Sequence, residues 1–276
     1  MKSTQEMLGP AGGMDEAQWS LQAGERALYV DGDLRNSRSW FDTAYREAAN
    51  LGDGTAMARA ALGLGGLWVS EHRTEADSAR VRTRQLDALA LIDPRSSLAL
   101  RLRIRLAAEE DFRLGEHATI LALVAEARDA GHPEALAEAL GLAHHCVLGP
   151  EHGALRLGLA RELIGAAART GRRSDLLMGL LCHGIDLFLA ADPQAERLLE
   201  ELRRLLDEAG NLAIEYVLSA LEVMLGIRAG RFEEAEAMAA ACAARGAAVG
   251  DPVATGWQVA QIGAIRWYQG RVTELL

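Results

Sequence analysis

Glycine, Asp-Pro and Gly-Asp elements, which are typical of helix ends, recur along this 276-residue chain at nearly constant distances. Glycine ends a helix by taking the left-handed conformation just past its last turn, and aspartate or proline opens the next helix. Between these marks lie segments of about 14 to 19 residues, in which apolar side chains recur three and four positions apart. The pattern predicts thirteen helices and the first turn of a fourteenth.

The odd-numbered helices are expected to begin near residues 15, 55, 96, 133, 173, 211 and 253. The spacings between these starts are 40, 41, 37, 40, 38 and 42 residues. A fixed period of this size is typical of stacked helix pairs, each of which buries its apolar face against its neighbours. We therefore predict an all-α fold, a single right-handed superhelical α-solenoid of about seven antiparallel helix pairs over residues 15–276. A flexible leader is expected at residues 1–14.

Composition supports the helical prediction. Half of the residues are apolar, but only 13 are aromatic (5 Trp, 4 Tyr and 4 Phe). The core must therefore consist mainly of Ala and Leu, which favour helices and lack the β-branched shape that suits strands.

The net charge and the cysteine content limit which partners and which cellular compartment we expect. The net charge of −10 disfavours direct binding of nucleic acid, because phosphates are neutralised by clustered Lys and Arg. The three cysteines form no CxxC pair, which fits a reducing cytoplasm. No uncharged apolar run of 18 residues is present, so we expect a cytoplasmic protein without a membrane span.

Two segments share a turn-and-helix pattern, GRFEEAEAMA at 230–239 and GDLRNSRSWFDTAYREA at 32–48. In each, a glycine precedes an apolar residue by two positions, and a small residue follows three positions later. The pattern resembles the turn and second helix of tetratricopeptide repeats (TPR). The period of about 40 exceeds the 34 residues of that family, so these are longer, TPR-like units.

A second resemblance covers residues 95–276. The segments LGLAHHCVLGPEH, LEVMLGIRAGRFEEAEAMAAACAARGAAVGDP and IRWYQGRVTELL, in this order, resemble the C-terminal repeat region of large actinobacterial LuxR-type/ATPase transcriptional regulators. The resemblance implies a repeat array that holds a partner domain or senses an effector. This chain has neither a GxxxxGK[ST] phosphate loop nor a DNA-binding helix pair, so nucleotide hydrolysis and DNA binding are not carried over. Because QGR opens a further helix in such regulators, we expect a C-terminally truncated solenoid, a fragment of a larger regulator.

Histidine and cysteine gather in two consecutive first helices. Aligning these helices on their central glycines places His144 over Cys182 and His145 over His183. Zinc requires three or four such ligands in tetrahedral arrangement, but adjacent histidines point about 100° apart on a helix. We favour packed and groove-lining side chains over a metal site.

Seven arginines face only two aspartates between residues 80 and 105. Such an excess can receive an acidic partner or a phosphate, but their spacing distributes them around a helix, and a solvated face is favoured. The seven are Arg80, Arg82, Arg84, Arg95, Arg101, Arg103 and Arg105.

The glycines of GLGGLW at 63–68 invite comparison with a dinucleotide-binding loop. No strand precedes them, and Trp68 stands where the third glycine of GxGxxG belongs. We expect these glycines to lie inside a helix and to permit close approach of a neighbouring helix.

These observations favour a non-enzymatic interaction and sensor module of a bacterial regulatory protein. It is expected to bind a protein partner, an attached effector domain or an effector in its concave groove. The alternative is a small-molecule binding protein for a natural-product-like ligand. We predict no catalytic residue, cofactor or metal; a homo-oligomer is compatible with the exposed ends of an array. Aromatic residues of the first helices can face the groove or make ordinary inter-repeat contacts. The groove candidates are Trp19, Tyr29, Arg105, Phe112, His144, His145, His183, Trp257 and Trp267.

Overall fold

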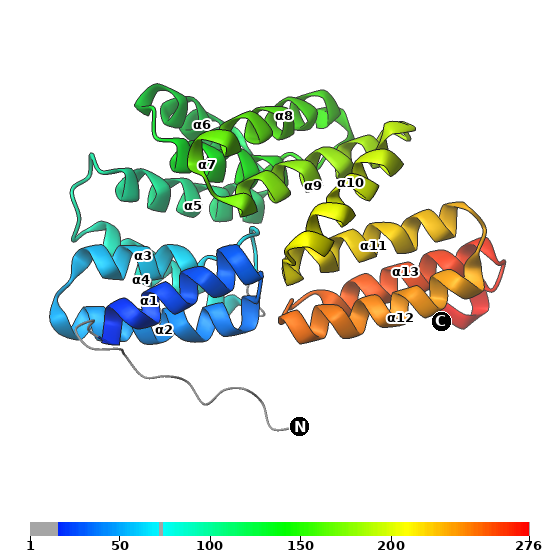
Figure 1. Cartoon of the computed structure of the whole chain (residues 1–276), viewed down its shortest axis with the longest axis horizontal. Coiled ribbons are helices and arrows are strands. Elements are labelled where there is room, and N and C mark those ends of the chain that lie inside the picture. The colour runs from blue at the N-terminus through cyan, green and yellow to red at the C-terminus, as the bar shows by residue number, and fades with distance from the viewer. Residues whose placement is uncertain (1–15, 72–73, 276) are drawn as a thin grey trace.

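The computed structural model describes residues 16–71 and 74–275, and its described part is helical throughout, without a strand (Figure 1). The predicted leader at residues 1–14 lies outside the described residues. The α-helices are α1 (Glu16–Glu25), α2 (Leu34–Leu51), α3 (Gly54–Leu64), α4 (Glu75–Leu89), α5 (Ser97–Leu114), α6 (Ala118–Ala130), α7 (Pro133–Cys146), α8 (Gly153–Thr170), α9 (Arg173–Leu189), α10 (Gln194–Glu208), α11 (Leu212–Arg228), α12 (Phe232–Val249) and α13 (Ala254–Tyr268). Three short helical turns complete them, η1 (Arg26–Asp31), η2 (Pro150–His152) and η3 (Val272–Leu275).

The helix boundaries follow from residues that cap them. Each odd-numbered helix begins within one residue of its expected position. Side chains such as those of Asp33 and Asn211 accept a backbone N–H from the first turn, which would otherwise lack a partner. At the other end, glycines such as Gly115 adopt positive φ angles just past the last turn. These capping residues and glycines therefore set the lengths of the helices.

Helices pack in the order of the chain. The odd-numbered helices also contact one another in succession, from α1 through α13, and we call this series of helices the inner row. The even-numbered helices lie outside this row and contact mainly their sequence neighbours. The prediction of an all-helical array of sequentially packed helices is confirmed. None of the described helices is long and apolar enough to cross a membrane.

The core is made of small and aliphatic side chains. Alanines and leucines dominate its two clusters, one of which joins the N-terminal helices to α9–α13 while the other fills α5–α8. The largest fully buried side chains are Tyr216 and Phe41. The scarcity of aromatic residues thus leads to the Ala/Leu core that composition predicts.

Residues near the two ends of the array contact each other. Arg35 and Arg38 of α2 donate hydrogen bonds to the carbonyl oxygens of Ala247 and Gly250, and Asn211 donates to the carbonyl of Val30. Figure 1 shows α2 and α12 meeting end to end. The array therefore curls until residues near its two ends touch.

The GLGGLW segment differs in part from its expected structure. α3 ends at Leu64, so only Gly63 lies inside the helix, and Gly66 sits in the following turn with φ +76°. The expected reason for Gly63 is correct, because a Cβ atom there would meet the Phe41 ring at 2.2 Å. At Gly66, a Cβ atom would collide with the buried carboxylate of Glu71, which accepts the N–H groups of Leu67 and Trp68. The glycines therefore serve packing and a tight turn.

Candidate functional site

An irregular turn places the first residue of the candidate site. α1 continues directly into η1, a π-helical stretch that contains Tyr29. π-Helical turns are rare and frequently occur at functional sites, because they widen the helix and redirect a side chain. η1 also contacts α9, so Tyr29 lies beside residues that follow it by more than 140 positions.

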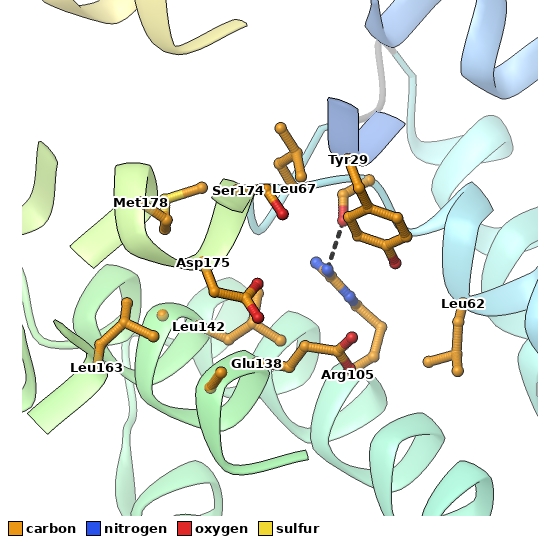
Figure 2. A pocket seen from close by; sticks show the side chains of 13 residues that line it. Tyr29, Leu62, Leu67, Arg105, Glu138, Leu142, Leu163, Ser174, Asp175 and Met178 are labelled. Atoms are coloured by element: carbon orange, nitrogen blue, oxygen red, sulfur yellow. Dashed lines mark hydrogen bonds between the residues drawn. The ribbon is translucent and has the colours of Figure 1, made fainter. Parts of the chain in front are cut away.

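The residues around Tyr29 enclose a cavity on the inner face of the array, which we call the inner cavity. Figure 2 shows Tyr29, Arg105, Glu138 and Asp175 pointing toward the same space from four different segments. The cavity volume is about 50 Å³, room for about three to five waters at roughly 10–15 Å³ each. Its apolar walls come from residues such as Leu142 and Met178.

Ion pairs join the charged residues at one side of the inner cavity. Arg101 binds the Glu138 carboxylate with two nitrogens, at 2.8 Å from Nε and 2.5 Å from Nη2. Arg172 Nη1 lies 3.6 Å from the same carboxylate, and its Nε donates to Asp175 at 3.1 Å. The guanidinium carbon of Arg172 also lies 5.3 Å from the centre of the Tyr29 ring, within range of a cation–π contact. These five residues form what we call the inner network.

Burial and charge perturb the acid–base properties of this network. Burial alone would raise the pKa of Glu138, but Arg101 and Arg172 outweigh it and hold that pKa below its usual value. Burial, supported by the negative charge of Glu138, raises the pKa of the Tyr29 phenol. Burial also raises the pKa of Asp175, although Arg172 opposes it. The site therefore combines fixed charges of both signs with a neutral hydroxyl.

Two buried polar atoms at the inner cavity have no hydrogen-bond partner. They are the hydroxyl of Ser174, which lines the cavity, and Nη2 of Arg172 in the adjacent network. An unpaired buried polar group costs about 1–3 kcal/mol. These atoms can be satisfied by a ligand that offers hydrogen-bond acceptors.

Arg105 is held by the turn that follows α3. Its two terminal nitrogens donate to the carbonyls of Gly66 and Trp68 at 2.6 and 2.9 Å. This predicted groove residue thus lines the inner cavity while it fixes the turn over residues 65–71.

A second polar cluster is buried between α7, α8 and α9. His144 Nε2 lies 3.0 Å from one Asp186 oxygen, and Arg156 Nε donates to the other at 2.7 Å. Burial would lower the pKa of His144, but the neighbouring Cys182 and Asp186 outweigh it and raise the pKa to about 10. No hydrogen bond of regular geometry reaches Nδ1 of His144. His144 and Cys182 are only 2% and 1% exposed, so their side chains are shielded from solvent.

In the part of the chain that the structure describes, His145 and His183 make no hydrogen bond to that cluster, although the ring of His145 lies 6.1 Å from the ring of His144. His145 packs against the Trp68 ring and hydrogen-bonds the carbonyl of Gly141, and burial lowers its pKa to about 4. His183 is half-buried, and its Nε2 has no partner. Among the described residues, no group of three or more His, Cys, Asp or Glu side chains is placed to hold a metal ion.

The basic segment between residues 80 and 105 forms a solvated face only in part, because Arg80, Arg82 and Arg95 are exposed and the other four arginines are half-buried or buried. Four of the seven pair with acids on neighbouring helices: Arg82 with Glu110, Arg84 with Asp42, Arg101 with Glu138, and Arg103 with Glu126. Spacing along the chain conceals this outcome, because the partners lie on other helices.

The aromatic candidates divide between the two alternatives. Tyr29 faces the inner cavity, whereas Trp19 packs edge-on against Trp40 with ring centres 4.9 Å apart. Trp257 packs against Tyr216 and is partly exposed. Phe112 and Trp267 are exposed away from the inner cavity. Of the nine predicted site residues, the structure brings only Tyr29 and Arg105 together around the cavity.

Sequence reasoning missed most of the inner network. Glu138, Arg172 and Asp175 belong to no motif, and they lie more than 100 residues from Tyr29 along the chain. The one usable signal is position, since Arg172 and Asp175 flank the start of α9, on the inner row.

Comparisons with protein-family models, curated proteins and solved structures yield no match to this chain.

Proposed function

We propose that this chain is a non-enzymatic interaction and sensor module of a bacterial regulatory protein, which recognises a small polar effector at its inner cavity. We take its architecture to be a right-handed, TPR-like superhelix of about seven helix pairs, and its output to be contact with a partner or attached effector domain. The observation that carries the proposal is the convergence of Tyr29, Arg105, Glu138 and Asp175 on one cavity that contains an unpaired Ser174 hydroxyl.

Stability alone does not account for such a site. Buried ion pairs repay their desolvation cost poorly, and apolar residues of similar volume often replace them without loss. Perturbed pKa values and unpaired polar atoms in a cavity are features of functional sites. The inner network is therefore better explained by recognition than by packing.

The cavity indicates the class of effector. Glu138 and Asp175 offer negative charge to an ammonium group. Arg105, Tyr29 and Ser174 offer donors to a carboxylate. A cavity of about 50 Å³ admits only a very small molecule. A small zwitterion, such as one of the smallest amino acids, fits both the charge and the size.

A thermal-shift titration of the purified chain tests this proposal. The probes are glycine, alanine, serine and acetate, each added to wild type, Tyr29→Phe, Ser174→Ala and Tyr268→Phe. Tyr268→Phe is the matched control, because Tyr268 is exposed and lies outside the cavity. At least one zwitterion should raise the melting temperature, since ligand at 100 times Kd adds about 2.7 kcal/mol of stability.

The variants should separate site-specific binding from a general solute effect. We expect Tyr29→Phe and Ser174→Ala to weaken the response about tenfold in concentration, as loss of one hydrogen bond implies. Tyr268→Phe should respond as wild type does. No shift with any zwitterion, or equal shifts in all variants, would contradict the proposal.

A further inference from the structure

A larger cleft lies at the opposite end of α9 from the inner cavity. It has a volume of about 520 Å³ and is bounded by the start of α8, the end of α9 and the loop before α8; we call it the α8–α9 cleft. Asp175 and Asp186 are 11 residues apart on α9, so the two sites are separated by about 16 Å along the helix. The volume falls within the range of roughly 300–1,000 Å³ that is usual for small-molecule sites.

The walls of the α8–α9 cleft are mostly apolar. Leu148 and Leu189 are exposed at its rim, at 51% and 54%, and Leu187 is buried deeper. Large aliphatic side chains exposed around a hollow offer a surface that an apolar ligand would cover. The remaining apolar lining residues are Pro150, Ala154, Leu157 and Ala190.

One buried cation lies at the floor of this cleft. Arg156 is only 4% exposed, and its Nε and Nη1 are used by Asp186 and by the carbonyls of Val147 and Gly149. Within the described part of the chain, its Nη2 makes no hydrogen bond, although Arg156 lines the cleft. A guanidinium nitrogen with free N–H groups at the wall of a cleft can donate to a hydrogen-bond acceptor that enters the cleft.

The start of α8 adds to the preference for an acceptor. Gly153 and Ala154, its first residues, line the same cleft, and the helix begins without a side-chain cap. The N-terminal end of a helix carries partial positive charge. Both carboxylates that line the cleft already have partners. Asp186 pairs with Arg156 and His144, and Asp192 accepts the N–H of Gln194.

We propose that the α8–α9 cleft binds an apolar molecule that carries one carboxylate or carbonyl group, with this group on Arg156 Nη2 and the apolar part between Leu148, Leu187 and Leu189. This site is independent of the inner cavity and of its effector. The contact of His144 with Asp186 contributes to this site, because it fixes the carboxylate that orients Arg156.

Titrations with three probes of equal chain length test the assignment. Octanoate, octanamide and octylamine are titrated into the full chain by calorimetry. Octanoate and octanamide should bind, and octylamine should bind at least about tenfold more weakly, because an ammonium group cannot accept from Arg156. A stronger response to octanoate than to octanamide would assign the site to carboxylates, and the reverse would assign it to carbonyl compounds.

A pair of matched variants separates cleft binding from adsorption elsewhere. Leu189→Asp places a negative charge at the rim, whereas Leu114→Asp makes the same change at a residue with 55% exposure that also ends its helix, α5. We expect Leu189→Asp to weaken octanoate binding at least about tenfold and Leu114→Asp to leave it within about twofold. Equal binding of octylamine, no binding of octanoate and octanamide, or equal loss in both variants would overturn the assignment. None of these variants touches the inner cavity, so a failure here leaves the amino-acid titration unaffected.

Discussion

Two parts of the array bury different chemistry, although both are built from stacked helices. Between α5 and α9, the interior includes the charged residues Arg105, His144, Arg156 and Asp186. Between α11 and α13, the interior consists mainly of aliphatic side chains such as Leu218, Val223 and Ile265. Apolar contacts dominate the second part, so the buried charges of the first part are a local feature of the array, which fits the recognition site proposed above.

The largest change in the free energy of unfolding is expected when the buried Asp186 carboxylate is removed. Asp186→Ala leaves Arg156 and His144 buried without their shared carboxylate. Breaking a buried pair in this way destabilises a protein by about 3–5 kcal/mol. Urea unfolding followed by circular dichroism measures the change, with Asp207→Ala as an exposed control on α10. A loss of stability of less than about 1 kcal/mol would show that Arg156 and His144 do not depend on the Asp186 carboxylate.

Smaller changes in the free energy of unfolding are expected from substitution of two glycines, one in a tightly packed and one in an open position. A Cβ atom at Gly246 in α12 would meet the Tyr216 ring at 2.6 Å, whereas one at Gly158 in α8 would meet nothing within 4 Å. Gly246→Ala should therefore destabilise the chain by about 1–3 kcal/mol through overpacking. Gly158→Ala should stabilise it by about 0.5–1 kcal/mol, since alanine favours helix. The same unfolding assay tests both, and equal signs would contradict the packing described here.

The two neighbouring histidines should give opposite pH dependences. The pKa of His144 is raised to about 10 by Cys182 and Asp186, so its stabilising proton is fully bound below pH 6.5 and is lost as the pH rises toward 10. The pKa of His145 is lowered to about 4 by burial, so its contribution is present above pH 6.5 and is lost as the pH falls toward 4.

Unfolding free energies measured from pH 5 to pH 9 test these opposite signs. Each histidine can contribute a slope of up to about 1.4 kcal/mol per pH unit. His144→Gln should flatten the decline above pH 6.5, and His145→Gln should flatten the decline below it. If His144→Gln instead leaves the alkaline decline unchanged, the imidazole is not held in its charged form.

The sequence predicts the helices well because their signals are local. The caps, glycines and apolar spacings that define α7 or α12 all lie within the helix or next to it. The inner cavity depends on contacts between residues such as Tyr29 and Arg172, which lie far apart in the chain. No local pattern encodes the curl of the array, and the π-helical turn at Arg26–Asp31 has no sequence signature of its own. The starts of the odd-numbered helices were therefore predictable to within a residue, whereas only Tyr29 and Arg105 of the inner cavity were predicted as site residues.

We propose that the inner network serves recognition and not stability. Its direct test replaces the four charged residues of the network at once, with Arg101→Met, Glu138→Leu, Arg172→Met and Asp175→Asn, and compares this variant with Glu138→Leu alone. The single change removes the carboxylate that Arg101 and Arg172 share and should cost about 3–5 kcal/mol. The fourfold variant should be within about 1 kcal/mol of wild type, or more stable, while it loses the thermal response to small amino acids. A fourfold variant as unstable as the single one would show that the network is structural and would contradict the account.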